Sequence, residues 1–331
     1  MKTIVFDILN NDNGSSQALA AAVQFAKENN NYKLKLFGDS TQIKDVQLPD
    51  NIEFVHSPNL LKKTENLRDV LRTNSSMLDA IKALSEPDHV AILSSGDSGS
   101  YLTMATLKIK RLNNISRPAF MPLIPKRKDG SFLLLDVGAN LEVKANYLTE
   151  WAKLGSLFYS TMNNTQKPSV ALMNIGTEDY KGLESHKEAN LILKQNKNIN
   201  YLGFIEPKDI FDKQKNIDVV VCDGYAGNMI LKTMETSFLT MGRLIKEAIL
   251  STFVSKIGGL LIKKSIKKLG KKFDYRNVGA AYVIGLEKIV LKAHGGSDKK
   301  AFLGALNQIK IAIESNVIEK MKQELSEEAN V

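Results

Sequence analysis

Short apolar runs alternate along this sequence with longer stretches whose apolar residues recur at helical spacing. Such alternation is typical of α/β proteins, in which helices connect the parallel strands of a sheet. The pattern therefore predicts a three-layer α/β/α fold with a mostly parallel sheet. Strands are predicted over Thr3–Leu9, Lys33–Phe37, His89–Leu93, Phe132–Val137, Ser169–Ile175, Asn200–Phe204, Asp218–Cys222 and Ile289–Ala293. Helices are predicted over Gln17–Glu28, Glu65–Leu84, Asn146–Ser160, Leu183–Lys194, Asn228–Leu250 and Lys299–Leu325.

The chain of 331 residues is predicted to form a single domain, 1–331, because no shift in composition divides it. Hydrophobic residues make up 43% and charged residues 24%, which excludes wholesale disorder. Pro118, Pro122 and Pro125 punctuate a connection that leads into the polar turn 126–130. This is the place where a soft domain boundary would fall.

Several classes of protein are excluded by what the sequence lacks. A lone cysteine, Cys222, excludes a disulfide framework and any cysteine-based metal site, and the histidines show no metal-ligand spacing. We therefore predict neither a metal nor a cofactor. No phosphate-binding loop of the nucleotide-binding type follows a strand, and Ser98 lacks the spacing of a hydrolase nucleophile. The absence of a long apolar segment or a signal peptide, together with the lone cysteine, predicts a cytoplasmic protein.

Polar turns, most of them with glycine, follow nearly every predicted strand. In a parallel sheet such turns gather at the carboxyl edge, where α/β proteins bind their ligands. The helices that begin just after the turns direct free N–H groups and positive dipole ends into the same crevice, which favours an anion. The turns span residues 7–12, 94–99, 136–140, 176–179, 223–228 and 294–298.

Four residues in these turns or just after them are candidates for catalysis. Lys181 could hold a phosphate as a point charge, or it could be a solvated lysine at a helix start. His294, beside two glycines, could donate to a phosphate, act as an acid or base, or cap a turn. Asn140 and Asn228 could stabilise an oxyanion with their amides or serve as helix caps. Further candidates for binding the substrate or phosphate are Gly96, Ser98, Gly138, Gly176, Thr177, Glu178, Asp223, Gly224, Gly227, Gly295 and Ser297.

Most of the net charge of +9 comes from one segment, Ile249–Tyr275, which contains seven lysines and one acidic residue. Its apolar residues form two rows at helical spacing, and Gly258-Gly259 are predicted to divide it into two helices. A basic amphipathic tip of this kind suits an anionic membrane or an acidic protein, although an ordinary core-packed helix with solvated lysines shows the same pattern. Because arginine is absent from the segment and aromatic residues are scarce, nucleic acid is not the expected partner. The residues predicted to make these contacts are Lys256, Lys263, Lys264, Lys267, Lys268, Lys271, Lys272, Ile257, Leu261, Ile262, Ile266 and Leu269.

Several motifs follow one another in a specific order along most of the chain. They are Arg117-Pro118-Ala119, the run 132–140 that ends in Asp136-Val137-Gly138-Ala139-Asn140, Gly176-Thr177-Glu178-Asp179-Tyr180-Lys181-Gly182, Asp223-Gly224-Tyr225-Ala226-Gly227-Asn228, and Lys292-Ala293-His294-Gly295-Gly296-Ser297-Asp298. Together they resemble the bacterial phosphate acyltransferase family, PlsX. The sequence departs from the family at Asn10-Asn11, where glycines are usual, and at Asp97, where asparagine is usual. Asparagine tolerates a left-handed backbone, so the first turn is expected to keep its shape.

The resemblance implies a fold related to phosphotransacetylases and isocitrate dehydrogenases, a homodimer, and a helical tip at the membrane. It implies transfer of a long-chain fatty acyl group from acyl carrier protein to inorganic phosphate. Lys181 and His294 would then position the phosphate, and the acyl phosphate would pass to an acyl-phosphate:glycerol-3-phosphate acyltransferase for phospholipid synthesis. Two alternatives remain: a phosphotransacetylase-like enzyme that uses acyl-coenzyme A, and a catalytically weakened scaffold that binds the carrier protein or the membrane.

Overall fold

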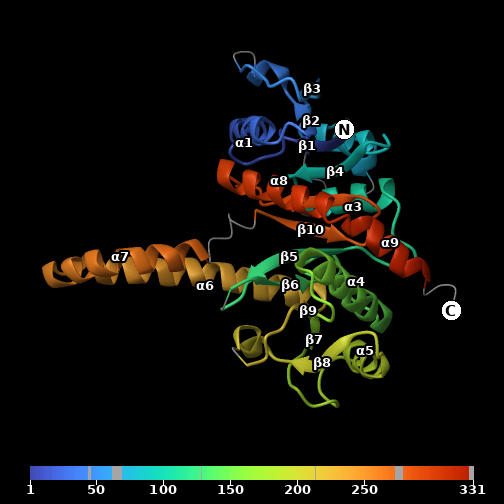
Figure 1. Ribbon diagram of the computed structural model, residues 1–331, viewed down its shortest axis with the longest axis vertical. Helices are drawn as coiled ribbons and strands as arrows, with labels where there is room; N and C mark the ends of the chain where they lie inside the picture. Colours follow the sequence, from blue (N-terminus) through green and yellow to red (C-terminus); the bar gives the residue numbers. More distant parts are fainter. Residues whose placement is uncertain (44–45, 62–68, 128, 213, 273–278, 328–331) are drawn as a thin grey trace.

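The protein is built around an 11-stranded mixed sheet (Figure 1). The computed structural model describes residues 1–43, 46–61, 69–127, 129–212, 214–272 and 279–327. In spatial order the strands run β3-β2-β1-β4-β11-β10-β5-β6-β9-β7-β8. Their bounds are β1 Lys2–Asp7, β2 Tyr32–Gly38, β3 Ile52–His56, β4 His89–Ser94, β5 Ala119–Pro125, β6 Ser131–Leu135, β7 Ser169–Met173, β8 Asn200–Ile205, β9 Val219–Val221, β10 Ala280–Ile284 and β11 Ile289–Ala293.

Most strand pairs are parallel, as predicted, but antiparallel pairs divide the sheet in the middle. Strands β3, β2, β1, β4 and β11 form one parallel group, and β6, β9, β7 and β8 form another. Between the groups, β10 is antiparallel to both β11 and β5, and β5 is antiparallel to β6. Strands β3, β5 and β10 were not predicted. The two parallel groups therefore belong to two halves of the molecule that share one sheet.

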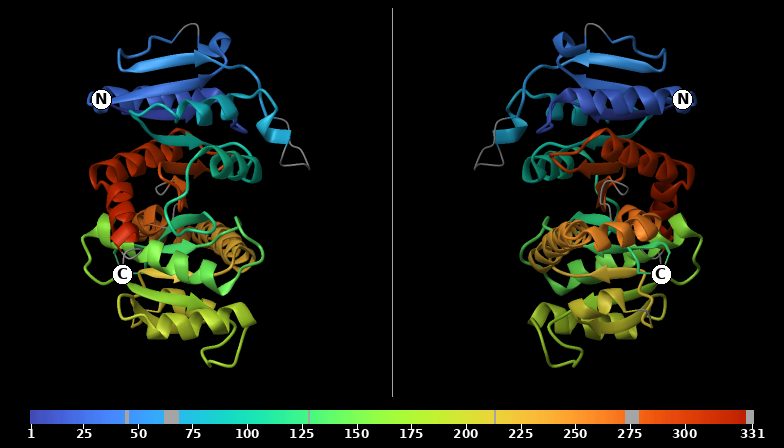
Figure 2. Two further views of the ribbon diagram at one scale, coloured as in Figure 1. Left: turned by 90° about the vertical axis from the view of Figure 1, so that its right-hand side faces the viewer. Right: turned by 90° about the vertical axis from the view of Figure 1, so that its left-hand side faces the viewer.

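Helices cover both faces of the sheet, which confirms the α/β/α architecture (Figure 2). One buried cluster packs α1, α4, α8 and α9 against one face, with the fully buried Trp151 on α4. The other cluster packs α2, α3 and the start of α6 against the opposite face. The helix bounds are α1 Ser15–Glu28, α2 Ser76–Ala83, α3 Ser98–Lys108, α4 Ala145–Asn163, α5 Glu184–Gln195, α6 Gly224–Leu250, α7 Phe253–Lys272, α8 Lys299–Glu314 and α9 Val317–Glu327.

Two predicted helices have different bounds in the structure. The helix predicted over Glu65–Leu84 begins only at Ser76, where the Ser75 hydroxyl caps the N–H of Leu78; residues 65–68 lie outside the described residues. The helix predicted over Lys299–Leu325 is two helices, α8 and α9, because Asn316 between them adopts a left-handed backbone with φ of 54°. Helix α3 was not predicted.

Helices α6 and α7 form a hairpin that extends from the body of the molecule (Figure 1). The break between them lies at residues 251–252, so the prediction that Gly258-Gly259 interrupts the helix is wrong. Instead, Gly259 lies inside α7 against the side chain of Ile249 on α6, where a Cβ atom would clash. Glycine here allows close packing of the two helices. Residues 273–275 of the predicted basic segment lie outside the described residues.

Candidate functional site

The polar turns fall into two groups, each following its own set of parallel strands. The first group comprises the turns after β1, β4 and β11, and the second comprises those after β6, β7 and β9. The prediction that one parallel sheet gathers all six turns at one edge is therefore wrong, because β10 and β5 interrupt the parallel order. Helix α6 begins in the second group. Lys232 lies in the third helical turn of α6, and its positive charge lowers the pKa of Lys292, which is at the end of β11 in the first group.

The first group is organised around the buried carboxylate of Asp7. It accepts hydrogen bonds from the hydroxyls of Ser94 at 2.7 Å and Ser76 at 2.8 Å, and from the side-chain amide of Asn10 at 3.0 Å. Burial raises the pKa of Asp7, and these hydrogen bonds oppose that rise. The carboxylate thus ties β1 to β4 and α2, and it is a structural centre rather than an open ligand.

Asparagine side chains replace glycine in the first turn and join neighbouring turns. The amide of Asn11 donates to the carbonyl oxygen of Gly295 at 2.9 Å and to that of Ser297 at 3.3 Å, while Asn10 also donates to Ser76. Neither asparagine has a positive φ; the described non-glycine residues with positive φ are four other asparagines. The expected left-handed backbone is therefore absent, and the asparagines act through their side chains.

The turn after β4 leads into α3. Asp97 caps this helix by accepting hydrogen bonds from the backbone N–H and the hydroxyl of Ser100, at 2.9 and 2.8 Å. Its carboxylate therefore serves the helix start, which explains how an acid is tolerated in this turn. Ser98 is exposed at the first position of α3, and Gly96 lies where a Cβ atom would strike Met77.

The turn after β11 contains the predicted residues His294, Gly295 and Ser297. His294 is exposed, and its Nδ1 atom accepts the N–H of Gly296 at 3.1 Å, so part of its role is to shape the turn. Gly295 lies against the Asp12 carboxylate, where a Cβ atom would come within 2.5 Å of Oδ2. Ser297 is 1% exposed, and no hydrogen-bond partner for its hydroxyl exists among the described residues.

The second group is organised around Asp136. This buried carboxylate accepts the backbone N–H groups of Phe120 at 2.9 Å, Ala139 at 3.2 Å and Asn140 at 2.6 Å. Burial raises its pKa to about 6, against the opposing effect of these hydrogen bonds. The Asn140 amide donates to the Pro118 carbonyl oxygen at 2.9 Å and to Asp136 at 3.1 Å. Both amide hydrogens of Asn140 thus fix the turn, and the structure does not leave them free for an oxyanion.

Helix α6 starts in very close contact with this turn. A Cβ atom on Gly224 would lie 2.5 Å from the carbonyl oxygen of Asn140, and one on Gly227 would clash with the carbonyl oxygen of Asp136. Gly138 adopts φ of 116° beside the side chain of Asn228. These glycines therefore permit backbone packing at the helix N-terminus, and Asn228 is the predicted amide that lies beside the turn.

Asp223, predicted to bind substrate or phosphate, caps α6. Its Oδ1 atom accepts the N–H of Ala226 at 2.8 Å, and its Oδ2 atom lies 3.5 Å from Nε2 of the buried His186 on α5. Although burial alone would raise the pKa of Asp223, these two partners outweigh burial and lower it. Sequence reasoning assigned His186 no site role, and the structure gives it a supporting position behind the cap.

The turn after β7 contains the predicted Gly176, Thr177, Glu178 and Lys181. Lys181 Nζ forms an ion pair with Glu178 Oε1 at 2.8 Å, and both side chains are about two-fifths exposed. The hydrogen bond with Glu178 raises the pKa of Lys181. Gly176 packs under both side chains, and Thr177 is exposed. Lys181 is therefore already neutralised by an acid that was predicted to bind the same substrate.

The structure places the two predicted phosphate-positioning residues in different groups of turns: Lys181 lies in the second group and His294 in the first.

Sequence reasoning missed Lys292 in the first group. Its Nζ atom donates to the carbonyl oxygens of Ser95 at 3.3 Å and Ala293 at 2.5 Å. The available signal was a lysine near the end of the otherwise apolar strand Ile289–Ala293.

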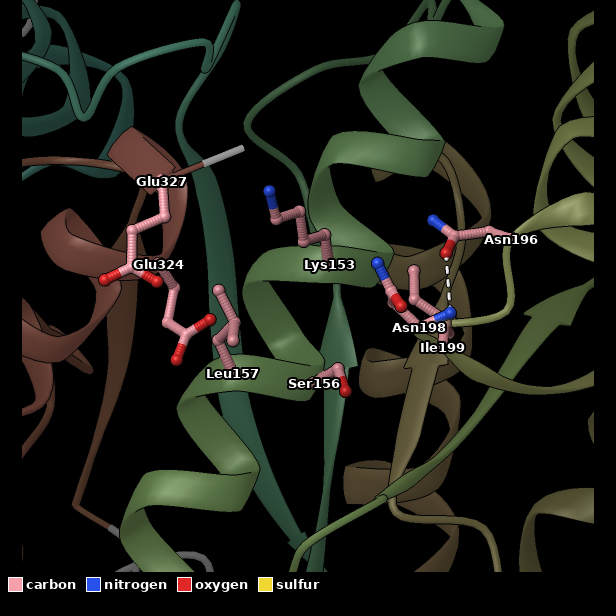
Figure 3. Close-up of a pocket in the computed structure, with 8 residues that line it drawn as sticks. All are labelled: Lys153, Ser156, Leu157, Asn196, Asn198, Ile199, Glu324 and Glu327. Carbon is pink, nitrogen blue, oxygen red and sulfur yellow. Dashed lines mark hydrogen bonds between the residues drawn. The ribbon is translucent and has the colours of Figure 1, made fainter. Parts of the chain in front are cut away.

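A cavity of about 380 Å³ lies outside both groups of turns, between α4, α9 and the loop that precedes β8 (Figure 3). It contains none of the predicted site residues. Its lining is Lys153, Ser156, Leu157, Asn196, Asn198, Ile199, Glu324 and Glu327. Within the described part of the chain, no three His, Cys, Asp or Glu side chains are arranged to hold a metal ion.

Comparison with known proteins identifies the family. A family model described as "Fatty acid synthesis protein" matches residues 2–320. The phosphate acyltransferase of Mycoplasma mobile is 50% identical over 327 residues, which cover 98% of this chain and 99% of the relative. The chain belongs to the phosphate acyltransferase (PlsX) family. A phosphate acyltransferase of Staphylococcus epidermidis strain ATCC 12228 is 35% identical over 329 residues, with coverage of 99% and 100%.

Membership of the phosphate acyltransferase family confirms the predicted family and the prediction of an enzyme of the acyltransferase class in fatty acid and phospholipid synthesis. The fold is also confirmed. A phosphotransacetylase from Streptococcus pyogenes superposes with a TM-score of 0.62 at 14% identity, covering 96% of this chain and 94% of that one. None of the helices in the described ranges is both long and apolar enough to cross a membrane.

Proposed function

We propose that this protein transfers a long-chain fatty acyl group from acyl carrier protein to inorganic phosphate. The observation that carries the proposal is the full-length similarity to phosphate acyltransferases. In the reaction, a phosphate oxygen attacks the thioester carbonyl, the C–S bond breaks, and the carrier leaves as a thiolate that takes up a proton. Thiolate is a good leaving group, so the main tasks of the protein are to desolvate the phosphate and orient it.

The two groups of turns offer the groups that such a reaction needs. Phosphate would be held by lysine, with His294 as a further donor, and by the N-termini of helices that begin in the turns. The Asn228 amide and backbone N–H groups would stabilise the oxyanion that forms on the thioester carbonyl. In this proposal Asn140 and Asp136 hold the shape of the turn beside Asn228.

A thioester assay tests this function. Purified protein is incubated with long-chain acyl carrier protein and phosphate, and the free carrier thiol and the acyl phosphate are measured. We expect phosphate-dependent thiol release with equimolar acyl phosphate. A preference for acyl-coenzyme A would instead support a phosphotransacetylase-like enzyme, and binding of the carrier without any release would support a scaffold.

The α6–α7 hairpin is proposed to contact an anionic membrane surface through its distal end. Phe253 and Val254 are each 78% exposed and Leu261 is 83% exposed, beside the exposed lysines of α7. Apolar side chains next to lysines suit the boundary between anionic headgroups and acyl chains. The same basic surface would attract the acidic acyl carrier protein. Lys272 is less available for this role, because its Nζ atom donates to the Arg127 carbonyl oxygen at 2.8 Å.

The protein is further proposed to act as a homodimer at the cytoplasmic side of the membrane. Leu239, Met241 and Leu244 on α6 are about half exposed, and burial against a second copy would remove this apolar surface from water. The acyl phosphate formed would pass to an acyl-phosphate:glycerol-3-phosphate acyltransferase, a partner expected from the family resemblance.

A further inference from the structure

The lysine at the end of β11 is unusual because it is largely desolvated and yet forms no ion pair with the described acids. Burial lowers the pKa of Lys292 to about 8. Its Nζ atom contacts two carbonyl oxygens, and none of the ion pairs formed by the described residues includes it. By contrast, the part-buried Lys126 lies 2.5 Å from the carboxylate of Asp218. A desolvated cation that makes no contact with an acid is costly to stability, which indicates that an anion completes the site when it binds.

The surroundings of Lys292 also have unused capacity for hydrogen bonding. An ammonium group has three donors, and two of those of Lys292 are directed to Ser95 and Ala293. In the adjoining turns the buried hydroxyls of Ser15 and Ser297 lack hydrogen-bond partners among the described residues. Helices α1, α3 and α8 begin in these same turns and present their N-terminal N–H groups there.

From this arrangement we infer that Lys292 is the residue that anchors the phosphate substrate, in the first group of turns. The identity of the anion rests on the proposed function. Lys181 is less suited to this task, because it is exposed and already paired with Glu178. Lys292 donates to the carbonyl oxygen of Ser95, in the turn after β4, and to that of its own neighbour Ala293 in β11, so its charge is fixed in place before phosphate arrives.

Direct binding of inorganic phosphate to the full chain tests the inference. Calorimetry at pH 7 compares the wild type with Lys292→Met, Lys292→Arg and Lys288→Met. Lys288 is a matched control, because it immediately precedes the same strand, is partly buried and donates to the carbonyl oxygen of His89 at 2.7 Å. We expect Lys292→Met to weaken phosphate binding by about 10- to 100-fold, from the loss of a charge-assisted hydrogen bond. Lys288→Met should stay within about twofold of the wild type.

A pH series on the wild type provides a second measurement that does not depend on the folding of a variant. Above pH 8 phosphate remains a dianion, whereas Lys292 loses its proton, so binding should weaken by up to about tenfold per pH unit. Asp7, Asp12, Asp97 and Lys232 also act electrostatically on Lys292. Because Lys292→Arg keeps its charge while these groups are unchanged, its series should be flat over the same range.

The outcomes separate this inference from the proposed function. Unchanged binding by Lys292→Met, a flat pH series in the wild type, or no binding of phosphate by the wild type would each overturn the role of Lys292. Phosphate binding that depends on Lys292 would support that role even if the thioester assay showed no transfer. Acyl transfer whose KM for phosphate is the same in the wild type and Lys292→Met would support the enzyme and reject Lys292.

Discussion

His186 Nε2 lies 3.5 Å from Oδ2 of Asp223, the carboxylate that caps helix α6. The two side chains come from different elements, α5 and the turn after β9, and both are largely buried. The contact fixes the carboxylate while its other oxygen receives the N–H of Ala226. A histidine outside the turns therefore supports the start of the helix on which Asn228 lies.

We expect His186→Leu to lower the free energy of unfolding by about 1–3 kcal/mol at pH 7, because a buried carboxylate loses a partner. Because the pKa of Asp223 is lower in the folded protein than its unfolded value of 3.8, the ionised carboxylate stabilises the fold at pH values above 3.8. This stability is lost as the pH falls through the folded pKa. The difference between variant and wild type should therefore shrink toward pH 3, which urea unfolding at several pH values measures. A difference that stays constant with pH would contradict the pairing.

Asp136 should make the protein less stable as the pH rises from 4 to 7. Its folded pKa is raised from 3.8 to about 6, so the folded state binds the proton more tightly than the unfolded state in this window. The loss amounts to about 3 kcal/mol at about 1.4 kcal/mol per pKa unit. Asp136→Asn should be less stable than the wild type, because the hydrogen-bond partners of the carboxylate on Phe120, Ala139 and Asn140 are all donors, but its pH profile should be flatter. Equal slopes in the two proteins would disprove the raised pKa.

Gly227→Ala should destabilise the protein by about 1–3 kcal/mol, because its methyl group would strike the carbonyl oxygen of Asp136. Gly270 on α7 is a matched control, since no atom lies within 4 Å of the place its Cβ would take. Gly270→Ala should be neutral or stabilising by up to about 1 kcal/mol, as alanine favours the helix. Thermal unfolding distinguishes the two, and equal effects would exclude close packing as the cause.

Val254→Ser combined with Leu261→Ser should weaken binding to anionic vesicles at least tenfold, because about 1.5–3 kcal/mol accompanies full burial of each such side chain. Lys→Glu changes at 263, 264, 267 and 268 should abolish sedimentation with the same vesicles by reversing the charge. Leu191→Ser, at an exposed apolar position on α5, is the control and should bind normally. Unchanged sedimentation of all variants would reject the hairpin as the membrane contact.

Leu244→Glu should convert a dimer into a monomer, because it places a charge on the exposed apolar side of α6. Analytical ultracentrifugation measures the change, and Leu191→Glu serves as the control on another surface. A wild type that sediments as a monomer at all concentrations would contradict the dimer, and a Leu244→Glu variant that remains dimeric would place the interface elsewhere.

Most of the predicted strands contain a run of apolar residues, but β10, Ala280–Ile284, is wholly apolar and was nevertheless missed. β5 escaped prediction because Pro122 and Pro125 argue against a central strand. In the structure, residues Ala119–Pro122 of β5 pair with β10, and pairing with β6 begins at Leu123. Pro122 is therefore tolerated at the point where β5 changes its pairing partner. The antiparallel centre of the sheet could not be predicted from local patterns, because it depends on which distant strands meet.

The candidate site was predictable as a set of turns but not as an arrangement. Glycine and aspartate after apolar runs located Asp223, Gly227 and His294 in sequence. The ion pair of Lys181 with Glu178 is local, because the two residues lie three positions apart in one turn, yet both were assigned to the substrate. The placement of Lys292 against the Ser95 carbonyl oxygen arises only when the end of β11 packs beside the turn after β4. Residue type shows which groups can carry charge, whereas the fold decides which of those charges has already been neutralised.

Helix α6 is one uninterrupted element of 27 residues, from Gly224 beside Asp136 to Leu250 at the far end of the hairpin. At 1.5 Å per residue it is a rod about 40 Å long. Its base is locked in place by glycine contacts, so a tilt imposed at the distal end must either bend the rod or displace Asn228. If the hairpin docks as proposed, a force at its distal end is therefore transmitted along α6 to the turn beside Asn228.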